Sequence, residues 1–249
     1  MEKIKSYVIS VNCPENENIE ENNHDYRSVK YKKRRKYISE HIIPSLSEFC
    51  EVQIFDAVTP KDFFYLEHRI VYKNKFLKRG LDRNYNKYSS DSMVANSLSF
   101  YELYLMSKKQ NTTVFLMEDD AFFPNKNNIL NIKTSIQEFL KLNYKSPSIL
   151  YLQSMCCWRK GFPIKTYPNE VLIDNGEFFD KIRHDWYDIA GNTGFVINPA
   201  GSEMLLEISE NEGIFNPDQM TTFAMNNKLI DVYIPKNNKD MVMINQELQ

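Results

Sequence analysis

The sequence predicts an α/β fold with a mostly parallel central sheet flanked by helices. Short apolar runs that indicate strands alternate along the chain with segments of helical periodicity. The clearest strand, 114–117, has four consecutive apolar residues, which is typical of a strand buried on both faces of a parallel sheet. No repeat or linker divides the chain, so we predict a single domain over residues 1–249.

The first elements follow in order. Residues 4–11 alternate and are rich in Val, Ile and Tyr, which predicts the first strand. A polar segment, 15–25, leads into a basic helix over 26–43, which Pro44 is expected to end. Residues 51–60 predict a second strand and a turn.

The middle of the chain gives two helices and two strands. We interpret the charged, aromatic stretch 62–88 as an active-site flap. Apolar residues at helical spacing predict the next helix, and they are Val94, Leu98, Tyr101 and Leu105. The strand 114–117 follows that helix, and a second helix around 129–140 precedes a strand at 148–152.

The last third departs from this rhythm. Residues 192–197 predict a strand, and Asn198 then caps a helix whose first turn begins with Pro199. The same Asn-Pro pair at 216–217 opens another helix, through about residue 225, and 230–235 predicts the final strand.

Composition excludes several classes of protein. With 31 basic and 33 acidic residues the net charge is −2, which gives no overall attraction to nucleic acid. No run approaches the ~18 apolar residues of a membrane span, and the N-terminus lacks a signal sequence, so we expect a cytoplasmic protein. The four cysteines have no CxxC spacing and are interpreted as free thiols. Neither GxGxxG nor a Walker loop occurs.

Three adjacent acids, Glu118, Asp119 and Asp120, end the strand 114–117. Ligands of open α/β sheets bind at the carboxyl ends of strands, and three carboxylates that repel one another gain from a shared cation such as Mg²⁺ or Mn²⁺. Strand alternation places Glu118 and Asp120 on one side and Asp119 on the other. The alternative is a polar loop or a helix cap.

Several segments together resemble glycosyltransferase family 25. They are the strand 7–12, the arginines Arg27, Arg34 and Arg35, the segment 52–58, the helix 96–103, the strand with its acids at 115–120, and the segments 194–202 and 217–219. The order of these blocks is that of the family, and they span nearly the whole chain. The chain departs from the family pattern at two positions. The family usually has glycine where this chain has Asn96, and it usually has histidine after the serine where this chain has Phe100 after Ser99. The segment 15–25 is also longer than expected.

The resemblance implies a GT-A fold, with a nucleotide-sugar-binding half at about 1–123 and an acceptor-side half at about 124–249. It implies UDP-sugar as donor and Mn²⁺ or Mg²⁺ as cofactor, with Asp120 as metal ligand, Glu118 contacting ribose or the metal, and Asp119 orienting its neighbours. The residues expected to line the uridine pocket are Ser10, Asn12, Asp56 and Ala57, at the ends of the first two strands.

The family is generally inverting, so the resemblance also implies a carboxylate that takes a proton from the acceptor hydroxyl. Asp218, in the first turn of a predicted helix, is the first candidate, although an acid there also complements the helix dipole. Asp185 and Asp188 are the next candidates, and His184 is a possible further metal ligand.

The resulting prediction is a metal-dependent enzyme that moves galactose or glucose from a UDP-sugar to a glycan or a hydroxylated side chain. Two alternatives stay open. A metal-dependent phosphohydrolase also uses acids after strands, but such sites draw on more ligands than this chain groups together. The second alternative is a non-catalytic binding protein that keeps the fold, and the departures from the family pattern at Asn96 and Phe100 are the reason to consider it.

Overall fold

The structure is a computed structural model, and it describes part of the chain. The described residues are 3–12, 26–59, 62, 91–142, 145–153, 157–159, 162–164, 172–182, 193–212, 217–236 and 241–248. The polar segment 15–25 and the predicted flap, apart from Asp62, lie outside these residues.

Eight strands form one mixed sheet in the order β2-β1-β3-β10-β5-β11-β9-β8. Their bounds are β1 Ile4–Ser10, β2 Cys50–Asp56, β3 Val114–Glu118, β5 Ser148–Tyr151, β8 Leu172–Asn175, β9 Phe179–Ile182, β10 Gly194–Ile197 and β11 Asp231–Pro235. Within this sheet β10 and β9 run against the common direction of the other strands. The predicted α/β class with a mostly parallel sheet is confirmed.

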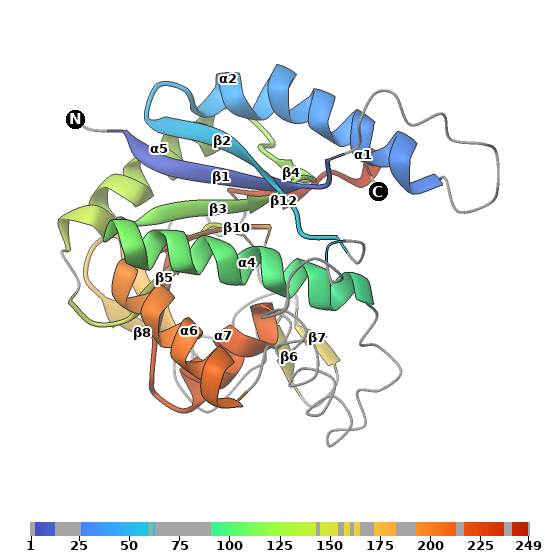
Figure 1. The fold of residues 1–249 in the computed structure, drawn as a ribbon. Helices are drawn as coiled ribbons and strands as arrows, with labels where there is room; N and C mark the ends of the chain where they lie inside the picture. Colours follow the sequence, from blue (N-terminus) through green and yellow to red (C-terminus); the bar gives the residue numbers. More distant parts are fainter. Residues whose placement is uncertain are drawn as a thin grey trace.

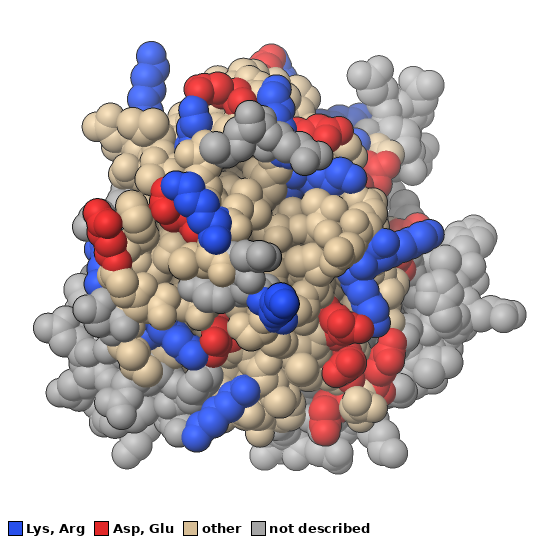
Figure 2. Space-filling model, turned by 90° about the vertical axis from the view of Figure 1, so that its left-hand side faces the viewer, with Lys and Arg blue, Asp and Glu red and all other residues tan. Residues whose placement is uncertain are grey.

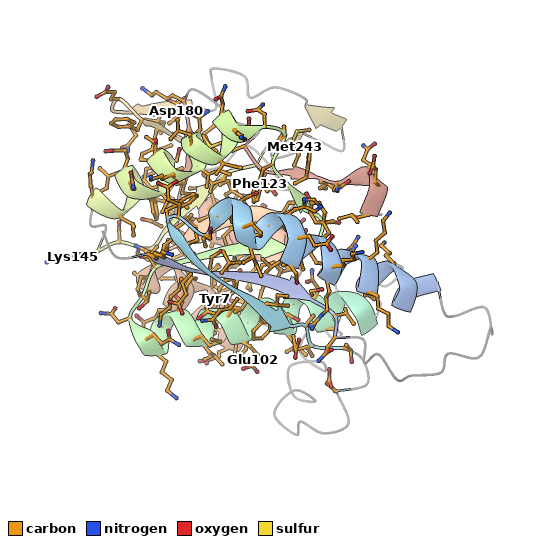
Figure 3. All side chains as sticks on the ribbon, turned by 90° about the horizontal axis from the view of Figure 1, so that it is seen from above. Tyr7, Glu102, Phe123, Lys145, Asp180 and Met243 are labelled. Carbon is orange, nitrogen blue, oxygen red and sulfur yellow. The ribbon has the colours of Figure 1, made fainter. Side chains whose placement is uncertain are left out.

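Helices cover both faces of this sheet (Figure 1). One face carries α1 Tyr26–Tyr37, the π-helical turn η1 Ile38–Ile42, α2 Ile43–Leu46 and α5 Lys126–Lys141. The view from above shows α1 to α2 and α5 side by side over the sheet (Figure 3). The other face carries α4 Asp91–Gln110, α6 Pro199–Glu212 and α7 Pro217–Asn226. The result is a helix–sheet–helix sandwich with a core on each side of the sheet.

Residues of β3 alternate between these two cores. Val114 and Leu116 pack with α4, α6 and α7, whereas Phe115 and Met117 pack against the α1 and α5 side. All four are 0–1% exposed, which explains the uninterrupted apolar run. The predicted strand buried on both faces is confirmed.

Pro44 does not end the first helix, contrary to prediction. The helical path continues to Leu46 through the π-helical turn Ile38–Ile42, in which the N–H of Ile43 donates to the carbonyl of Ile38. Pro44 then lies in α2, directly after that turn, and gives the helix no backbone N–H. Leu105 of α4 is also 37% exposed, although its spacing predicted burial.

The later helices begin as predicted. The Oδ1 atom of Asn198 accepts from the backbone N–H of Gly201 at 2.7 Å, and this contact caps α6. Pro217 opens α7. Both predicted halves of the chain supply strands to the one sheet. The assignment of donor binding to the first half and acceptor binding to the second stays a prediction.

Phe100, the departure from the family pattern, is a core residue. Its ring is 0% exposed and stacks on Phe195 of β10 with ring centroids 5.8 Å apart. The hydroxyl of Ser99, next to it, accepts from the N–H of Val58 at 2.9 Å. Phe100 therefore joins α4 to the sheet through apolar packing, and Ser99 joins α4 to the segment after β2.

The surface seen in Figure 2 lies at the amino ends of β1, β2 and β3. Basic and acidic side chains are interspersed on this face, and neither sign covers it among the residues described there. None of the helices within the described ranges is long and apolar enough to cross a membrane.

Candidate active site

The candidate site lies where β2, β1 and β3 end side by side. In the parallel register, Ser10 lies opposite Asp56, and Ile9 lies opposite Glu118. The N–H of Ala57 donates to the carbonyl of Ser10 at 2.9 Å, which keeps the first two strand ends together. The residues predicted for the donor pocket are thus brought to the same edge of the sheet as the acids.

Arg34 of α1 binds the acid cluster directly. Its Nη1 forms an ion pair with Oδ1 of Asp119, and its Nη2 pairs with Oδ2 of Asp120 at 3.1 Å. Its Nε donates to the carbonyl of Leu248 at 3.0 Å. Arg34 is 9% exposed, so this guanidinium is buried among its partners. A charge run on a helix usually forms a solvated face, and here one member of the run points inward.

Arg35, the next residue, ties the first two strand ends. Its Nε donates to the carbonyl of Val11 at 2.9 Å, and its Nη2 donates to the carbonyl of Ser10 at 3.3 Å. The same Nη2 forms an ion pair with Asp56, which also accepts from Nδ2 of Asn12 at 3.1 Å. The two arginines therefore bind the ends of all three parallel strands.

The acids form a turn and do not continue the strand. β3 ends at Glu118, and Asp119 and Asp120 lie in the turn before the short strand β4 Ala121–Phe122. Asp119 does not point away from Asp120, as strand alternation predicted, because both reach the guanidinium of Arg34. The alternation rule fails because the extended backbone stops one residue before Asp119.

Asp119 is held inside the turn by two neighbours. Its Oδ2 accepts from the hydroxyl of Ser10 at 3.1 Å, and Ser10 is 1% exposed. Burial raises the pKa of Asp119, and Arg34 offsets part of that rise. These contacts give Ser10 and Asp119 a role in the shape of the turn, and ligand contact by either residue stays a prediction.

The pKa of Glu118 is strongly raised. Burial is the main cause, and the negative charges of Asp120, Asp119 and Asp218 add to it, so that the pKa rises to about 8. The backbone N–H of Glu118 donates to the carbonyl of Thr193 at 3.3 Å. The Glu118 side chain keeps some exposed surface. A carboxyl with a raised pKa and other acids around it is typical of functional sites and is suited to bind a cation or a proton.

Asp218 approaches the same region from α7. Its charge raises the pKa of Glu118 and also those of Tyr104 and Tyr151, which burial raises first. Oδ1 of Asp218 accepts from the N–H of Gln219 at 2.8 Å. The structure thus brings this predicted catalytic carboxylate to the Glu118 side of the acid cluster, while its role stays a prediction.

Asp120 offers one free buried oxygen. Its Oδ2 binds Arg34, whereas Oδ1 is buried without a hydrogen-bond partner among the described residues. An unpartnered buried carboxylate oxygen fits a hard divalent cation. In the described part of the chain no group of three or more His, Cys, Asp and Glu side chains is arranged to hold a metal.

Three predicted site residues are not placed by the structure. Asp185, Asp188 and His184 fall outside the described residues. Sequence reasoning underestimated Arg34, and it missed the segment 241–248, whose backbone reaches the acid turn. Its strand β12, Met243–Ile244, has only two residues, too few to show a strand period.

The pKa of Glu118 has a consequence for stability. Its folded pKa of about 8 lies above the ordinary 4.5, so the folded state binds the proton more tightly and stability falls as pH rises from about 5 to about 8. We expect the unfolding free energy of the wild type to fall over this window relative to that of Glu118→Gln, measured in urea without added metal. Glu48, whose pKa Lys133 lowers, provides the control, because Glu48→Gln keeps Glu118 and its unfolding free energy should fall over this window in parallel with that of the wild type. A constant difference in unfolding free energy between wild type and Glu118→Gln would contradict the raised pKa of Glu118.

Comparison with known proteins agrees with this geometry. The family model described as glycosyltransferase family 25 (LPS biosynthesis protein) matches residues 27–221, which include both arginines, the acid turn and Asp218. No curated protein matches the chain significantly. The matched region covers more than half of the 249 residues. The chain therefore belongs to glycosyltransferase family 25, and it is a glycosyltransferase.

Proposed function

We propose that the protein transfers a hexose, galactose or glucose, from a UDP-sugar to a glycan acceptor, with inversion and with Mn²⁺ or Mg²⁺ as cofactor. One observation carries this proposal: Oδ1 of Asp120 is buried and unpartnered among the described residues, at an edge where three parallel strands end. A diphosphate brings oxygen ligands and negative charge, and this edge offers a place for a cation to join the two.

Asp120 would hold the cation through Oδ1, and Glu118 would contribute directly or through a metal-bound water. When bound, the cation offsets the negative charge that develops on the leaving diphosphate. Arg34 adds a fixed positive charge next to the same carboxylates. Its guanidinium also limits the repulsion between Asp119 and Asp120, so the turn keeps its shape before any ligand arrives.

Asn12 and Asp56 are the residues best placed for the nucleoside. Both are exposed at the ends of β1 and β2, and the contact between Asn12 and Asp56 is itself on the surface. Ala57, half-buried beside them, has only a methyl side chain. Ser10 is committed to Asp119, so we assign it support of the acid turn rather than contact with uridine.

Asp218 is the proposed base. As the sugar C1–O bond to the diphosphate breaks, the acceptor oxygen bonds to C1 from the opposite face and its proton passes to the Asp218 carboxylate. The negative charge of Asp218 acts on Glu118, which supports a position close to the donor end of the site. Asp185 and Asp188 are the alternative bases.

The acceptor class follows from the family description. The matching family is described by lipopolysaccharide biosynthesis, which favours a saccharide acceptor over a hydroxylated protein side chain. The protein would then act on the glycan part of such a lipid, where each added hexose supplies hydroxyls for the next transfer.

Asp120→Asn tests the donor site. It keeps the size of the side chain but removes the charge, so we expect kcat for UDP release from the preferred UDP-hexose to fall by about 10²-fold or more. Release by the wild type should need Mn²⁺ or Mg²⁺ and stop in EDTA. The measurement is a coupled UDP assay over a panel of UDP-sugars.

Asp180→Asn provides the matched control for that assay. Asp180 lies in β9, on a strand remote in the sheet order from β3, and its replacement should leave turnover unchanged. A rate of UDP release that neither EDTA nor the Asp120→Asn substitution lowers would refute the metal role. Binding of UDP without any release would indicate a non-catalytic protein, and release of phosphate from simple phosphomonoesters would indicate a hydrolase.

Asp218→Asn tests the base separately. Because the base acts in the transition state, we expect kcat to fall by about 10²- to 10⁴-fold while the affinity for UDP stays within about twofold of the wild type. The measurements are steady-state kinetics with acceptor and calorimetric titration with UDP. Unchanged kcat would move the role to Asp185 or Asp188.

A further inference from the structure

The segment 241–248 returns to the acid turn from beyond the region that the family model matches. That match ends at residue 221, whereas Met243 and Ile244 of β12 pair antiparallel with Phe122 and Ala121 of β4. Figure 3 shows Met243 close to Phe123, on the side of the sheet that α5 covers. The strand that directly follows the acids is therefore paired with a part of the chain that lies outside the family match.

The start of the segment is firmly seated on the sheet. The N–H groups of Met241 and Val242 both donate to the carbonyl of Leu152, at 3.1 and 2.9 Å. Gly194 of β10 makes room for this contact, because a Cβ at that position would lie 3.0 Å from the methyl carbons of Val242. Met241 and Val242 are 2% and 1% exposed. The segment is thus packed into the core before it reaches the site.

The end of the segment makes two contacts with the site itself. The N–H of Asn245 donates to the backbone carbonyl of Asp120 at 2.8 Å. The carbonyl of Leu248 accepts from Nε of Arg34 at 3.0 Å, and next to it Nζ of Lys33 donates to the carbonyl of Glu247 at 2.8 Å. One contact fixes the Asp120 backbone, and the other fixes the arginine that binds the Asp120 side chain.

The contact with Leu248 determines which donors Arg34 turns toward the acids. A guanidinium has five N–H donors in a rigid fork, and engaging Nε with Leu248 leaves Nη1 for Asp119 and Nη2 for Asp120. Without that anchor the fork is free to turn and pair with both oxygens of Asp120. Oδ1 would then be neutralised by the arginine and lost to a cation.

We propose that the segment 241–248 is a positioning element of the donor site, acting through the Asn245 N–H and the Leu248 carbonyl to keep Oδ1 of Asp120 open for a divalent cation. This inference rests on the proposed function. The positioning groups belong to the backbone, so the side chains of the segment can vary without loss of the effect.

Asn245→Pro is the direct test, because proline removes the N–H that binds Asp120. Asn245→Ala is the matched control: it keeps the N–H and loses the side chain, whose Oδ1 accepts from the N–H of Glu247. We expect Asn245→Pro to weaken Mn²⁺-dependent UDP binding by about tenfold, near the upper end of what one hydrogen bond between neutral groups contributes, and Asn245→Ala to change it by less than about threefold. UDP titration calorimetry with Mn²⁺ and with EDTA measures this, and thermal unfolding checks the fold.

Arg34→Lys keeps the result interpretable if the proline variant does not fold. Lysine retains the charge but has no fork with which to bind Leu248 and both acids together. We expect it also to lose the gain in UDP affinity that Mn²⁺ gives. Lys36→Gln on the same helix removes an exposed charge that lies 3.8 Å from Glu40, and it should keep that gain.

The outcomes separate this inference from the proposed function. If the wild type binds UDP with Mn²⁺ and the folded Asn245→Pro and Arg34→Lys variants bind it equally well, the segment does not position the site and the inference is wrong. If the wild type itself binds no UDP with Mn²⁺, the donor-site proposal fails first. Loss of Mn²⁺-dependent binding in both variants, with binding in EDTA and the unfolding temperature unchanged, supports the inference.

Discussion

The buried guanidinium of Arg34 is the interaction on which the candidate site depends. Asp119 and Asp120 are adjacent, 6% and 8% exposed, and would repel each other if both were ionised in this position. Arg34 pairs with each of them and also binds the carbonyl of Leu248. A buried pair of this kind contributes little net stability compared with an apolar core, but removing one partner costs about 3–5 kcal/mol. Its value here lies in geometry, since it fixes the direction of each carboxylate.

The sheet explains why this geometry arises at one edge. Parallel pairing of β2, β1 and β3 aligns their carboxyl ends, and burial of β3 on both faces leaves its first polar residues at the strand end. α1 crosses above these ends and presents consecutive arginines, Arg34 to the acid turn and Arg35 to β1 and β2. α7 approaches from the other layer with Asp218. Two helices from opposite faces of the sheet thus bring opposite charges to one place, an arrangement suited to hold a charged donor and a reacting hydroxyl.

Sequence reasoning succeeded where local signals are strong. The apolar run of β3 indicates a buried strand, and Pro199 and Pro217 each mark the first turn of a helix, α6 and α7. Sequence reasoning failed where contacts between residues far apart in the sequence determine the structure. Nothing near Arg34 shows that it alone of its charge run is buried, since its partners are 85 and 214 residues away. A π-helical turn comes just before Pro44, and the local composition does not indicate such a turn. β8, β9 and β12 are strands of two to four residues, too short for a period to stand out.

The most direct test is a crystal structure of the protein with UDP and Mn²⁺ bound. We predict anomalous density for Mn²⁺ at Oδ1 of Asp120, next to the diphosphate of UDP, with Arg34 still bound to Asp119 and Leu248. Density for Mn²⁺ and UDP at another part of the fold, or a diphosphate held by Arg34 with the acids displaced and no cation, would contradict it.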